Sequence, residues 1–255
     1  MAIKIKLLTY NICHGMDYTD AKNPNFERNW LNINLNKNAN AIKNSCAEIV
    51  CLNEIYNEGD GLLNKQPEFL ASEAGIDYHA FAEALRFGNN SYGNAILSKY
   101  KIIQSKTFLV PAPVGDERRE NENEYYEDRA VLKVVVDVNG VLVSVYATHF
   151  GLNLLEQERM VSTLLNCFET EKNPYILMGD FNAEPKESVL TPIFNKMQSV
   201  QKAMGNNQKT FSTFNEQIQI DYIFVSKEFT PNAFTRIECN ASDHYPCLAE
   251  VTLNV

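Results

Sequence analysis

The stretch MGDFNAEP (residues 178–185) places Asp180 and Asn182 directly after the apolar segment YILM. A short apolar run bounded by turn residues is typical of a buried strand. Asp180 and Asn182 therefore stand where the strand ends, and residues at such positions often carry function. An isolated Asp-x-Asn is more often a plain turn, so the interpretation depends on what stands at the ends of the other strands.

Polar residues recur at the ends of other predicted strands. The apolar patterns predict strands at 3–10, 47–52, 130–138, 141–148, 175–178, 221–225 and 245–253. The polar residues at their ends are Asn11, Glu54, His149, Asp221, Asp243 and His244. In antiparallel sheets the end of one strand lies beside the start of its neighbour. We therefore expect these residues to gather at one edge, in a site of carboxylates, amides and imidazoles.

Helix and strand patterns together indicate the fold class. Helical spacing is present around 30–45, from 67 to 73, at 154–168 and at 188–197. Asn139-Gly140 predicts a hairpin between 130–138 and 141–148, and 93–98 and 101–110 are predicted to form another strand pair. Strands both in hairpins and separated by helices favour two packed sheets covered by helices. We therefore expect a four-layer α/β/β/α sandwich, with 1–255 as a single catalytic domain.

The composition narrows the functional classes. The chain has 255 residues, a net charge of −9 and 45% hydrophobic residues, as expected for a globular protein without a basic surface for nucleic acid. No signal peptide or membrane span is predicted, so we expect a cytoplasmic protein. The six cysteines are expected to be mainly small buried residues in a reducing compartment. Cys and His are not clustered at the short spacings of a zinc site, which argues against a zinc hydrolase.

The residues themselves suggest a metal-dependent reaction. Mg²⁺ prefers oxygen ligands, which Glu54 and Asp243 would supply with Asn11 as a neutral partner. Asp180 would orient or deprotonate a water molecule. Asp221 would hold the imidazole of His244 in one tautomer.

Seven segments strengthen this interpretation, because they occur in the order of known motifs. TYNICHG, CLNE, GNAILS, ATHF, MGDFNAEP, IDYIFVS and ASDHYP resemble motifs of the endonuclease/exonuclease/phosphatase superfamily, which has a deoxyribonuclease-I-like fold. The resemblance runs from residue 6 to residue 253, and GDFN together with SDHxP is its most specific part. It implies a four-layer sandwich and Mg²⁺-dependent hydrolysis of a phosphoester, with Mn²⁺ as a possible substitute.

The resemblance also implies roles for individual residues. The implied catalytic residues are His149, Asp180, Asn182, Asp221 and His244, and the implied metal residues are Asn11, Glu54 and Asp243. The second motif departs from the usual Gln-Glu, because Asn53 precedes Glu54. The first motif carries Cys13, where relatives often have another polar or ring residue.

Some residues allow two interpretations. His14 would contact substrate or only pack, and Asn94, with Tyr92, would line the site or only form a turn. Arg129 would bind phosphate, because a bidentate guanidinium suits phosphate oxygens, or form a surface ion pair with Glu127 or Asp128. The segment 115–128 (GDERRENENEYYED) is either a solvated surface loop or a loop that selects substrates.

The substrate class stays open among several phosphoesters. The segment 115–128 has seven acidic residues and two arginines, and negative charge near a site repels a polyanion. A small, lipid-type or nucleotide-type phosphoester is therefore the expected substrate. The alternatives are a nuclease that acts on DNA or RNA, although the charge does not indicate nucleic acid, and a binding module that kept the fold and lost activity.

Overall fold

Two β-sheets packed face to face form the centre of the computed structural model, which describes residues 2–23, 26–120, 122 and 125–254. The strands of the first sheet are β1 (Ala2–Asn11), β2 (Ile49–Tyr56), β3 (Tyr78–Phe87), β4 (Asn90–Ser98), β11 (Phe229–Arg236) and β12 (Cys247–Asn254). Those of the second are β5 (Ile102–Val110), β6 (Arg129–Val138), β7 (Val141–His149), β8 (Tyr175–Asp180), β9 (Gln198–Ser199) and β10 (Asp221–Val225). The spatial orders are β11-β12-β1-β2-β4-β3 and β5-β6-β7-β8-β10-β9.

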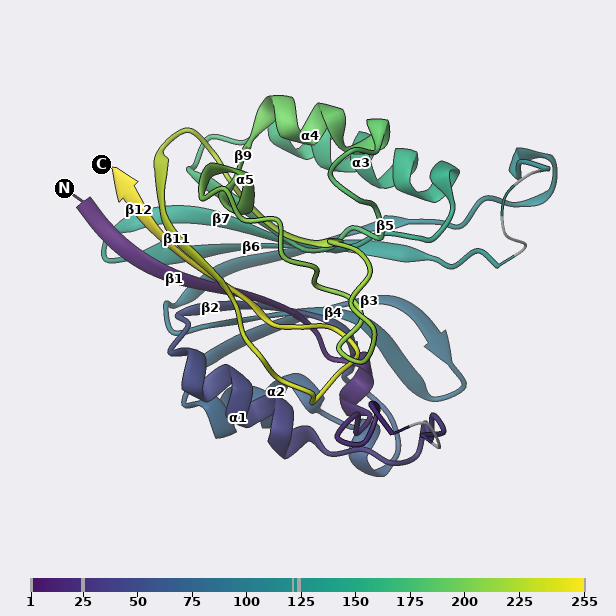
Figure 1. Cartoon of the computed structure of the whole chain (residues 1–255). Coiled ribbons are helices and arrows are strands. Elements are labelled where there is room, and N and C mark those ends of the chain that lie inside the picture. Colours follow the sequence, from purple (N-terminus) through teal and green to yellow (C-terminus); the bar gives the residue numbers. More distant parts are fainter. Residues whose placement is uncertain (1, 24–25, 121, 123–124, 255) are drawn as a thin grey trace.

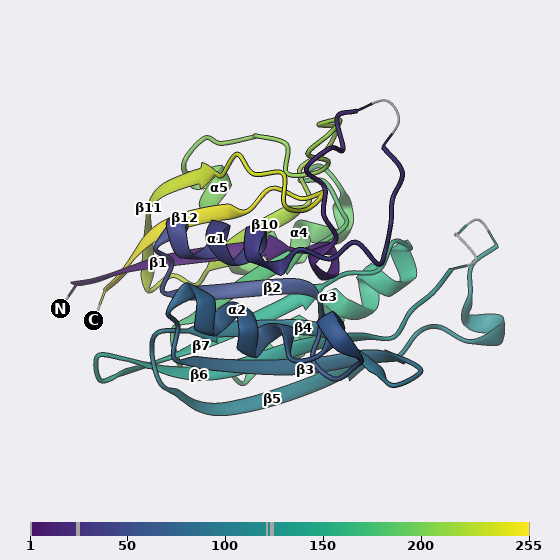
Figure 2. The same ribbon diagram turned by 90° about the horizontal axis from the view of Figure 1, so that it is seen from below.

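Helices cover the outer faces of both sheets. Helices α1 (Leu35–Ser45) and α2 (Gln66–Ala74) lie against the first sheet. Helices α3 (Leu154–Glu169) and α4 (Thr191–Lys196) lie against the second, while the short α5 (Val200–Ala203) contacts β10 and β11. Figure 1 shows the layers from the green helices at the top to the purple and blue helices at the bottom, and Figure 2 shows α1 and α2 in front of their sheet. The predicted α/β/β/α sandwich is thus confirmed.

The central strands are apolar on both faces because each sheet is covered on both sides. In β1, Ile5 and Leu7 belong to the core between the sheets, whereas Leu8 and Tyr10 pack under the helices. Side chains of a strand point alternately to its two faces, so both faces here must be apolar. Near-continuous apolar runs such as LLTY and IVCL follow from this double burial.

The structure corrects several predicted elements. The hairpin at Asn139-Gly140 is confirmed, since β6 and β7 pair directly. The predicted pairing of 93–98 with 101–110 is wrong: β4 pairs with β2 and β3, whereas β5 pairs with β6 in the other sheet. The chain crosses between the sheets at residues 99–101, so neighbours in sequence are not neighbours in space. Strands β3 and β11 were not predicted, and the helix expected around 30–45 begins at Leu35.

The thiols and the surface complete the description. In the described part of the chain all six cysteines are free; four are buried, Cys239 is half-buried and Cys46 is exposed after α1. Cys46 therefore departs from the expectation of a buried thiol.

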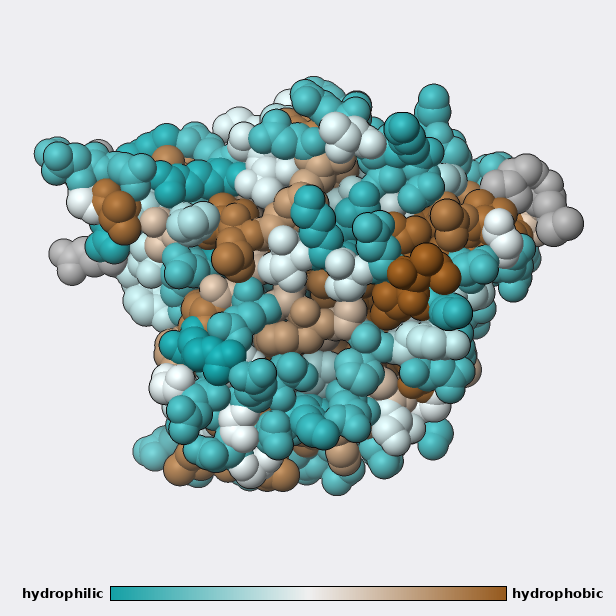
Figure 3. Space-filling model, turned by 180° about the vertical axis from the view of Figure 1, so that it is seen from behind, coloured by the Kyte–Doolittle hydropathy of each residue, from teal (hydrophilic) through white to brown (hydrophobic). Residues whose placement is uncertain are grey.

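None of the described helices combines the length and the apolar character that crossing a bilayer requires. Figure 3 shows that the face behind the view of Figure 1 is mainly hydrophilic, interrupted by brown apolar patches.

Candidate active site

Strand pairing brings the predicted site residues together. Asn11, His149 and Asp180 are the last residues of β1, β7 and β8, and Asp221 is the first residue of β10. The parallel pairing of β7 with β8 puts His149 opposite Asp180, and the antiparallel pairing of β8 with β10 puts Asp221 opposite Asp180. Four strands from two sheets therefore end at the same place, as expected from the sequence.

Gly179 allows this close approach at the end of β8. Its φ is +150°, and a Cβ there would lie 1.9 Å from the carbonyl oxygen of Thr148. Only glycine fits such a position without displacing the backbone. The glycine of the GDFN motif thus sets the distance between β7 and β8, and with it the position of Asp180.

A network of amides beneath the site joins the two sheets. The side chain of Asn53 accepts a hydrogen bond from the backbone N–H of Asp180 (3.0 Å) and donates to the carbonyl of Thr148 (2.9 Å). The same amide donates to Asn94 Oδ1 at 2.8 Å, and Asn94 donates to the carbonyl of Ala130 at 2.8 Å. Asn94 therefore lies below the cavity and supports Asn53. It is absent from the cavity wall, which Tyr92 does line.

Glu54 approaches Asp180 through the amide of Asn11. Glu54 lies in an irregular stretch of β2, with a φ of 54°, rather than after the strand as predicted. Asn11 Nδ2 donates to Glu54 Oε1 and to Asp180 Oδ2, both at 3.0 Å, while Asn11 Oδ1 accepts from the backbone N–H of Cys13. Burial and the nearby charge of Asp243 raise the pKa of Glu54. Two carboxylates are thus held around one amide at the edge of the cavity.

Asp221 and His244 form the predicted pair. His244 Nδ1 is 3.0 Å from Asp221 Oδ2, and its Nε2 is 3.6 Å from Asp180 Oδ2. Burial alone would lower the pKa of His244, but the carboxylates of Asp221 and Asp180 outweigh it and raise the pKa to about 10. His244 is therefore a cation at neutral pH. Burial and the charge of Asp221 raise the pKa of Asp180 despite the opposing effect of His244.

His149, Asn182 and Arg129 form the opposite side of this cluster. Asn182 Nδ2 is 3.3 Å from His149 Nε2, and Arg129 is 3.3 Å from His149 Nδ1. Burial and the positive charge of Arg129 hold the pKa of His149 well below its usual value, so this imidazole is neutral. Arg129 also pairs with Glu127 at 2.9 Å. Arg129 thus lines the cavity and also pairs with Glu127, but both side chains are largely buried, so this is not the surface ion pair of the alternative interpretation.

Asp243 has two partners that sequence reasoning missed. Its Oδ2 accepts a hydrogen bond from Tyr18 at 3.1 Å and lies 3.5 Å from Arg28. Both partners come from the segment between β1 and α1, where the sequence shows no strand pattern. No signal in the sequence places this segment beside residue 243.

A cavity of about 720 Å³ opens at this cluster, and Asn11, Asp221 and Tyr18 are not part of its wall. Its polar wall holds Arg28, Glu54, Glu127, Arg129, His149, Asp180, Asn182, Asp243 and His244. Its apolar wall is formed by Trp30, Tyr56, Phe87, Tyr92, Tyr125 and Leu152. Tyr125 and Glu127 belong to the segment 115–128, so the end of that segment reaches the cavity.

His14 also lies at the cavity wall. Its ring stacks on Trp30 with centroids 4.9 Å apart, and only 4% of the residue is exposed. Burial lowers the pKa of His14 to about 4, so the ring is neutral. The described residues include two groups whose ligand atoms all lie within 4.8 Å of one another and could hold a metal: Asp180 with Asp221 and His244, and Cys13 with His14 and Glu54.

The comparisons agree with this geometry. Residues 8–244 match the model of a family described as Endonuclease/Exonuclease/phosphatase family. A structure of that family from Beutenbergia cavernae superposes with a TM-score of 0.73 at 21% identity, over 98% of this chain and 72% of the other. No curated protein matches the chain.

Two further similar structures carry named activities. The mannosyl-6-phosphatase Bt3783 of Bacteroides thetaiotaomicron has a TM-score of 0.71 at 13% identity, over 97% of this chain and 99% of the other. ANGEL2, a 2′,3′-cyclic phosphatase in complex with adenosine-2′,3′-vanadate, has a TM-score of 0.72 at 14% identity, over 100% and 97%. At these identities the likeness shows the shared fold, which is the deoxyribonuclease-I-like sandwich.

Proposed function

Because the chain belongs to the Endonuclease/Exonuclease/phosphatase family, we propose that it is a Mg²⁺-dependent phosphoesterase that hydrolyses a phosphodiester or phosphomonoester by in-line attack of water. The observation that carries the proposal is the convergence of Asp180, Asn182, His149 and His244 in the wall of one cavity, with Asp221 buried behind His244. Members of this family are hydrolases, and phosphatases are among them.

The donor atoms fit a hard divalent cation. Within the described residues Glu54 has no ion pair with Lys or Arg, and the imidazole that lies 4.0 Å from its Oε1 is that of the neutral His149. The raised pKa of Glu54 indicates that its negative charge is not fully neutralised by its surroundings, and a bound cation would neutralise it. Glu54 and Asp243 would hold Mg²⁺, and Mn²⁺ would fit the same oxygens. Asn11 would join them through Oδ1 only after its amide turns, because Nδ2 now faces the carboxylates.

The remaining residues would act on water and phosphate. A bound Mg²⁺ would neutralise charge on the phosphoryl oxygens. Asp180 would orient the attacking water and take its proton, a task for which a raised pKa is suited. Asn182 and the neutral His149 would hold phosphoryl oxygens, with Arg129 behind them. The cationic His244, fixed by Asp221, would stabilise the charge that develops in the transition state.

The cavity wall supports a small organic phosphoester as the substrate. Trp30 is 56% exposed and Tyr125 is 55% exposed, so aromatic faces are available beside the polar cluster. Such faces suit the organic part of a lipid-type or nucleotide-type ester. The similar structures named as a mannosyl-6-phosphatase and a 2′,3′-cyclic phosphatase act on phosphoesters, in line with this proposal. The alternative is a nuclease for DNA or RNA, and Arg28 and Arg129 are the cavity cations that would serve it.

The test is hydrolysis of a substrate panel with Mg²⁺, with EDTA and with Zn²⁺. The panel holds plasmid DNA, an abasic oligonucleotide, sphingomyelin, inositol phosphates, sugar phosphates and nucleotides. We expect turnover of at least one small ester with Mg²⁺, loss with EDTA, and a loss of at least a hundredfold in Asp180→Asn, because a positioned base contributes 10²–10⁴-fold. Asp77→Asn, an exposed position, is the matched control.

Absence of turnover on the whole panel, with Mg²⁺ binding intact, would favour the inactive binding module instead. Equal rates in Asp180→Asn and wild type would remove Asp180 from the mechanism. We further propose that residues 1–255 act as a single catalytic domain and that the protein works in the cytoplasm. Fractionation of the native cells is the check on its location.

A further inference from the structure

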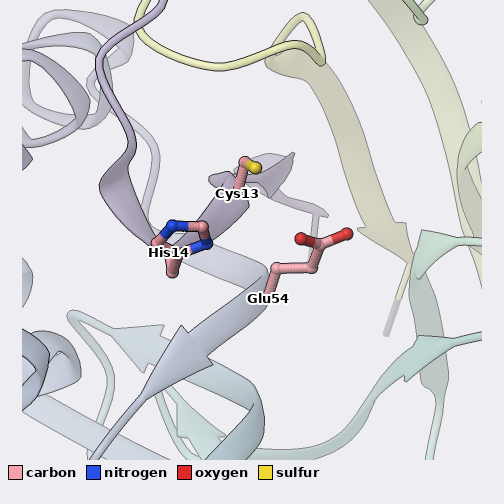
Figure 4. A group of neighbouring side chains, drawn as sticks. All are labelled: Cys13, His14 and Glu54. Atoms are coloured by element: carbon pink, nitrogen blue, oxygen red, sulfur yellow. The ribbon is translucent and has the colours of Figure 1, made fainter. Parts of the chain in front are cut away.

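A thiol, an imidazole and a carboxylate meet beside the proposed Mg²⁺ ligands. Cys13 and His14 lie on the short 3₁₀ turn Cys13–Gly15 that follows β1, and Glu54 lies on β2 (Figure 4). One potential ligand atom from each of the three residues lies within 4.8 Å of the other two. The mechanism proposed above uses Glu54 but leaves Cys13 and His14 without a task. The set of sulfur, nitrogen and oxygen donors differs from the all-oxygen set that Mg²⁺ prefers.

The imidazole of His14 has one unused nitrogen. Its Nε2 is buried and has no hydrogen-bond partner among the described residues, and the backbone of Trp30 lies close enough to the ring to raise its pKa against the effect of burial. With its proton on Nδ1, the neutral ring would present a bare lone pair at Nε2. Metal-bound histidines commonly donate their other ring N–H to a carbonyl or a carboxylate in this way.

Packing alone does not account for this arrangement. The stack on Trp30 accounts for the packing of the ring faces, but it gives Nε2 no hydrogen-bond partner. A buried acceptor without a partner destabilises the fold, so native proteins rarely keep one without a reason. His14 is 4% exposed, and Nε2 belongs to a side chain that lines the cavity. The orphaned nitrogen points to a ligand that the protein binds there.

We propose that Cys13 Sγ, His14 Nε2 and the carboxylate of Glu54 form a site for a thiophilic divalent cation of the Zn²⁺ type. Ligand atoms around Zn²⁺ lie about 2.0–2.3 Å from the metal, so the trio would close by up to about 1 Å, with water in the fourth position. On binding, the thiol releases its proton to solvent, and the thiolate and carboxylate then balance the charge of the metal. The search of the sequence for Cys and His at short spacing missed this trio, because Glu54 lies on β2, far from Cys13 and His14 in the sequence.

The site has a regulatory consequence through Glu54. A carboxylate committed to a cation beside Cys13 is withdrawn from the proposed Mg²⁺ site, so the two cations compete. Micromolar Zn²⁺ would then inhibit a Mg²⁺-dependent hydrolysis. This consequence rests on the proposed function, whereas the binding site itself does not.

Cobalt absorption tests the site directly, whether or not the protein is an enzyme. The reduced, chelator-treated protein is titrated with Co²⁺, and the near-ultraviolet thiolate-to-cobalt absorption is recorded. Wild type is expected to bind one equivalent with this band and to lose it when Zn²⁺ is added. Cys13→Ser and Cys13→Ala should lack the band, and His14→Gln should weaken Co²⁺ affinity at least tenfold. Cys46→Ser and His79→Gln, both at exposed positions, are the matched controls.

The outcomes separate this proposal from the proposed function. Absence of the band in wild type, or an unchanged band in a Cys13 variant whose circular dichroism is native, would overturn the site. So would equal losses in Cys46→Ser. Failure of every phosphoester assay would leave the cobalt spectrum unaffected. Mg²⁺ binding that is indifferent to Zn²⁺ would overturn the competition through Glu54.

Discussion

The amide of Asn11 lies between the carboxylates of Glu54 and Asp180 and donates a hydrogen bond to each. The side chain of Asn11 therefore holds two carboxylates close together in the absence of a cation. The charge of Glu54 is stabilised by this hydrogen bond but destabilised by burial and by Asp243, which together raise its pKa. A carboxylate with a raised pKa lowers the stability of the metal-free fold above that pKa. The site therefore stores unfavourable energy that a bound cation would release.

Replacement of Glu54 by Gln tests this balance. We expect Glu54→Gln to weaken Mg²⁺ binding clearly and to lower hydrolysis by orders of magnitude, because the metal stabilises phosphoryl charge. The metal-free variant should melt at an equal or higher temperature than wild type, since a buried charge is gone. Calorimetric titration and thermal unfolding measure the two effects, with the exposed Glu73→Gln as a surface control. Equal Mg²⁺ affinity in variant and wild type would remove Glu54 from the ligand set.

Asp221 sets the protonation of His244. The raised pKa of His244 contributes stability that is complete below its ordinary value of 6.5 and is lost as pH rises through about 10. Asp221→Asn removes a negative charge that raises the pKa of His244, while burial still lowers it, so the pKa of His244 should fall. We expect a native fold, nearly unchanged Mg²⁺ affinity and a lower kcat, with the basic limb of the rate profile moved to lower pH. NMR titration of His244 checks this; an unmoved pKa would contradict the pairing, and Asp77→Asn is the control.

At the residue scale, the grouping of most candidate-site residues could be predicted from the sequence. Motif residues such as Asp180, Asn182 and His244 do come together, because each stands at a strand end and strand pairing aligns those ends. Tyr18 and Arg28 could not be predicted, since they lie in a segment without periodicity and reach Asp243 only through the fold.

The elements were predictable where local chemistry decides them. Asn139-Gly140 fixes a hairpin, and the double burial of β2 and β8 gives short apolar runs. The predicted pairing of β4 with β5 was wrong. The two strands are adjacent in the sequence, which suggests a hairpin, and only the packing of the two sheets reveals the crossover. Strand β3 was missed because several of its side chains are exposed, which weakens the alternation.

The carboxylate of Glu171 anchors the end of α3 to the second sheet. It accepts a hydrogen bond from Tyr146 on β7 at 2.6 Å and pairs with Lys133 on β6 at 2.7 Å. Burial opposes its ionisation, but these two partners outweigh burial and lower the pKa of Glu171 to about 2. The stability from this group is present above about pH 4.5 and is lost as pH falls through about 2.

Glu171→Gln should therefore cost about 2 kcal/mol of unfolding free energy at pH 7, after allowance for solvent screening. The difference from wild type should shrink between pH 4.5 and pH 2. Urea unfolding at several pH values measures it, with the exposed Glu169→Gln as control. A difference that stays constant down to pH 2 would show that packing, and not charge, is responsible.

The charge of the whole molecule bears on the substrate. The net charge is −9, and the cavity arginines are already paired, Arg28 with Asp243 and Arg129 with Glu127. A long polyanion would thus meet repulsion and few free cations, whereas a small ester needs only the cavity. We expect kcat/KM for small diesters or monoesters to exceed that for plasmid DNA and to vary little with salt. Efficient cleavage of plasmid DNA that falls steeply as salt rises would restore the nuclease interpretation.

Strand β1 lies between β2 and β12, and its residue Ala2 pairs with Asn254. During translation β1 leaves the ribosome long before β12 exists. At about 5–20 residues per second, roughly 10 to 50 seconds separate the two strands. Throughout that interval the apolar β1 and β2 have an open edge, which is a template for mispairing. The nascent chain therefore has to be shielded by chaperones, or remain loosely collapsed, until its last strand closes the sheet.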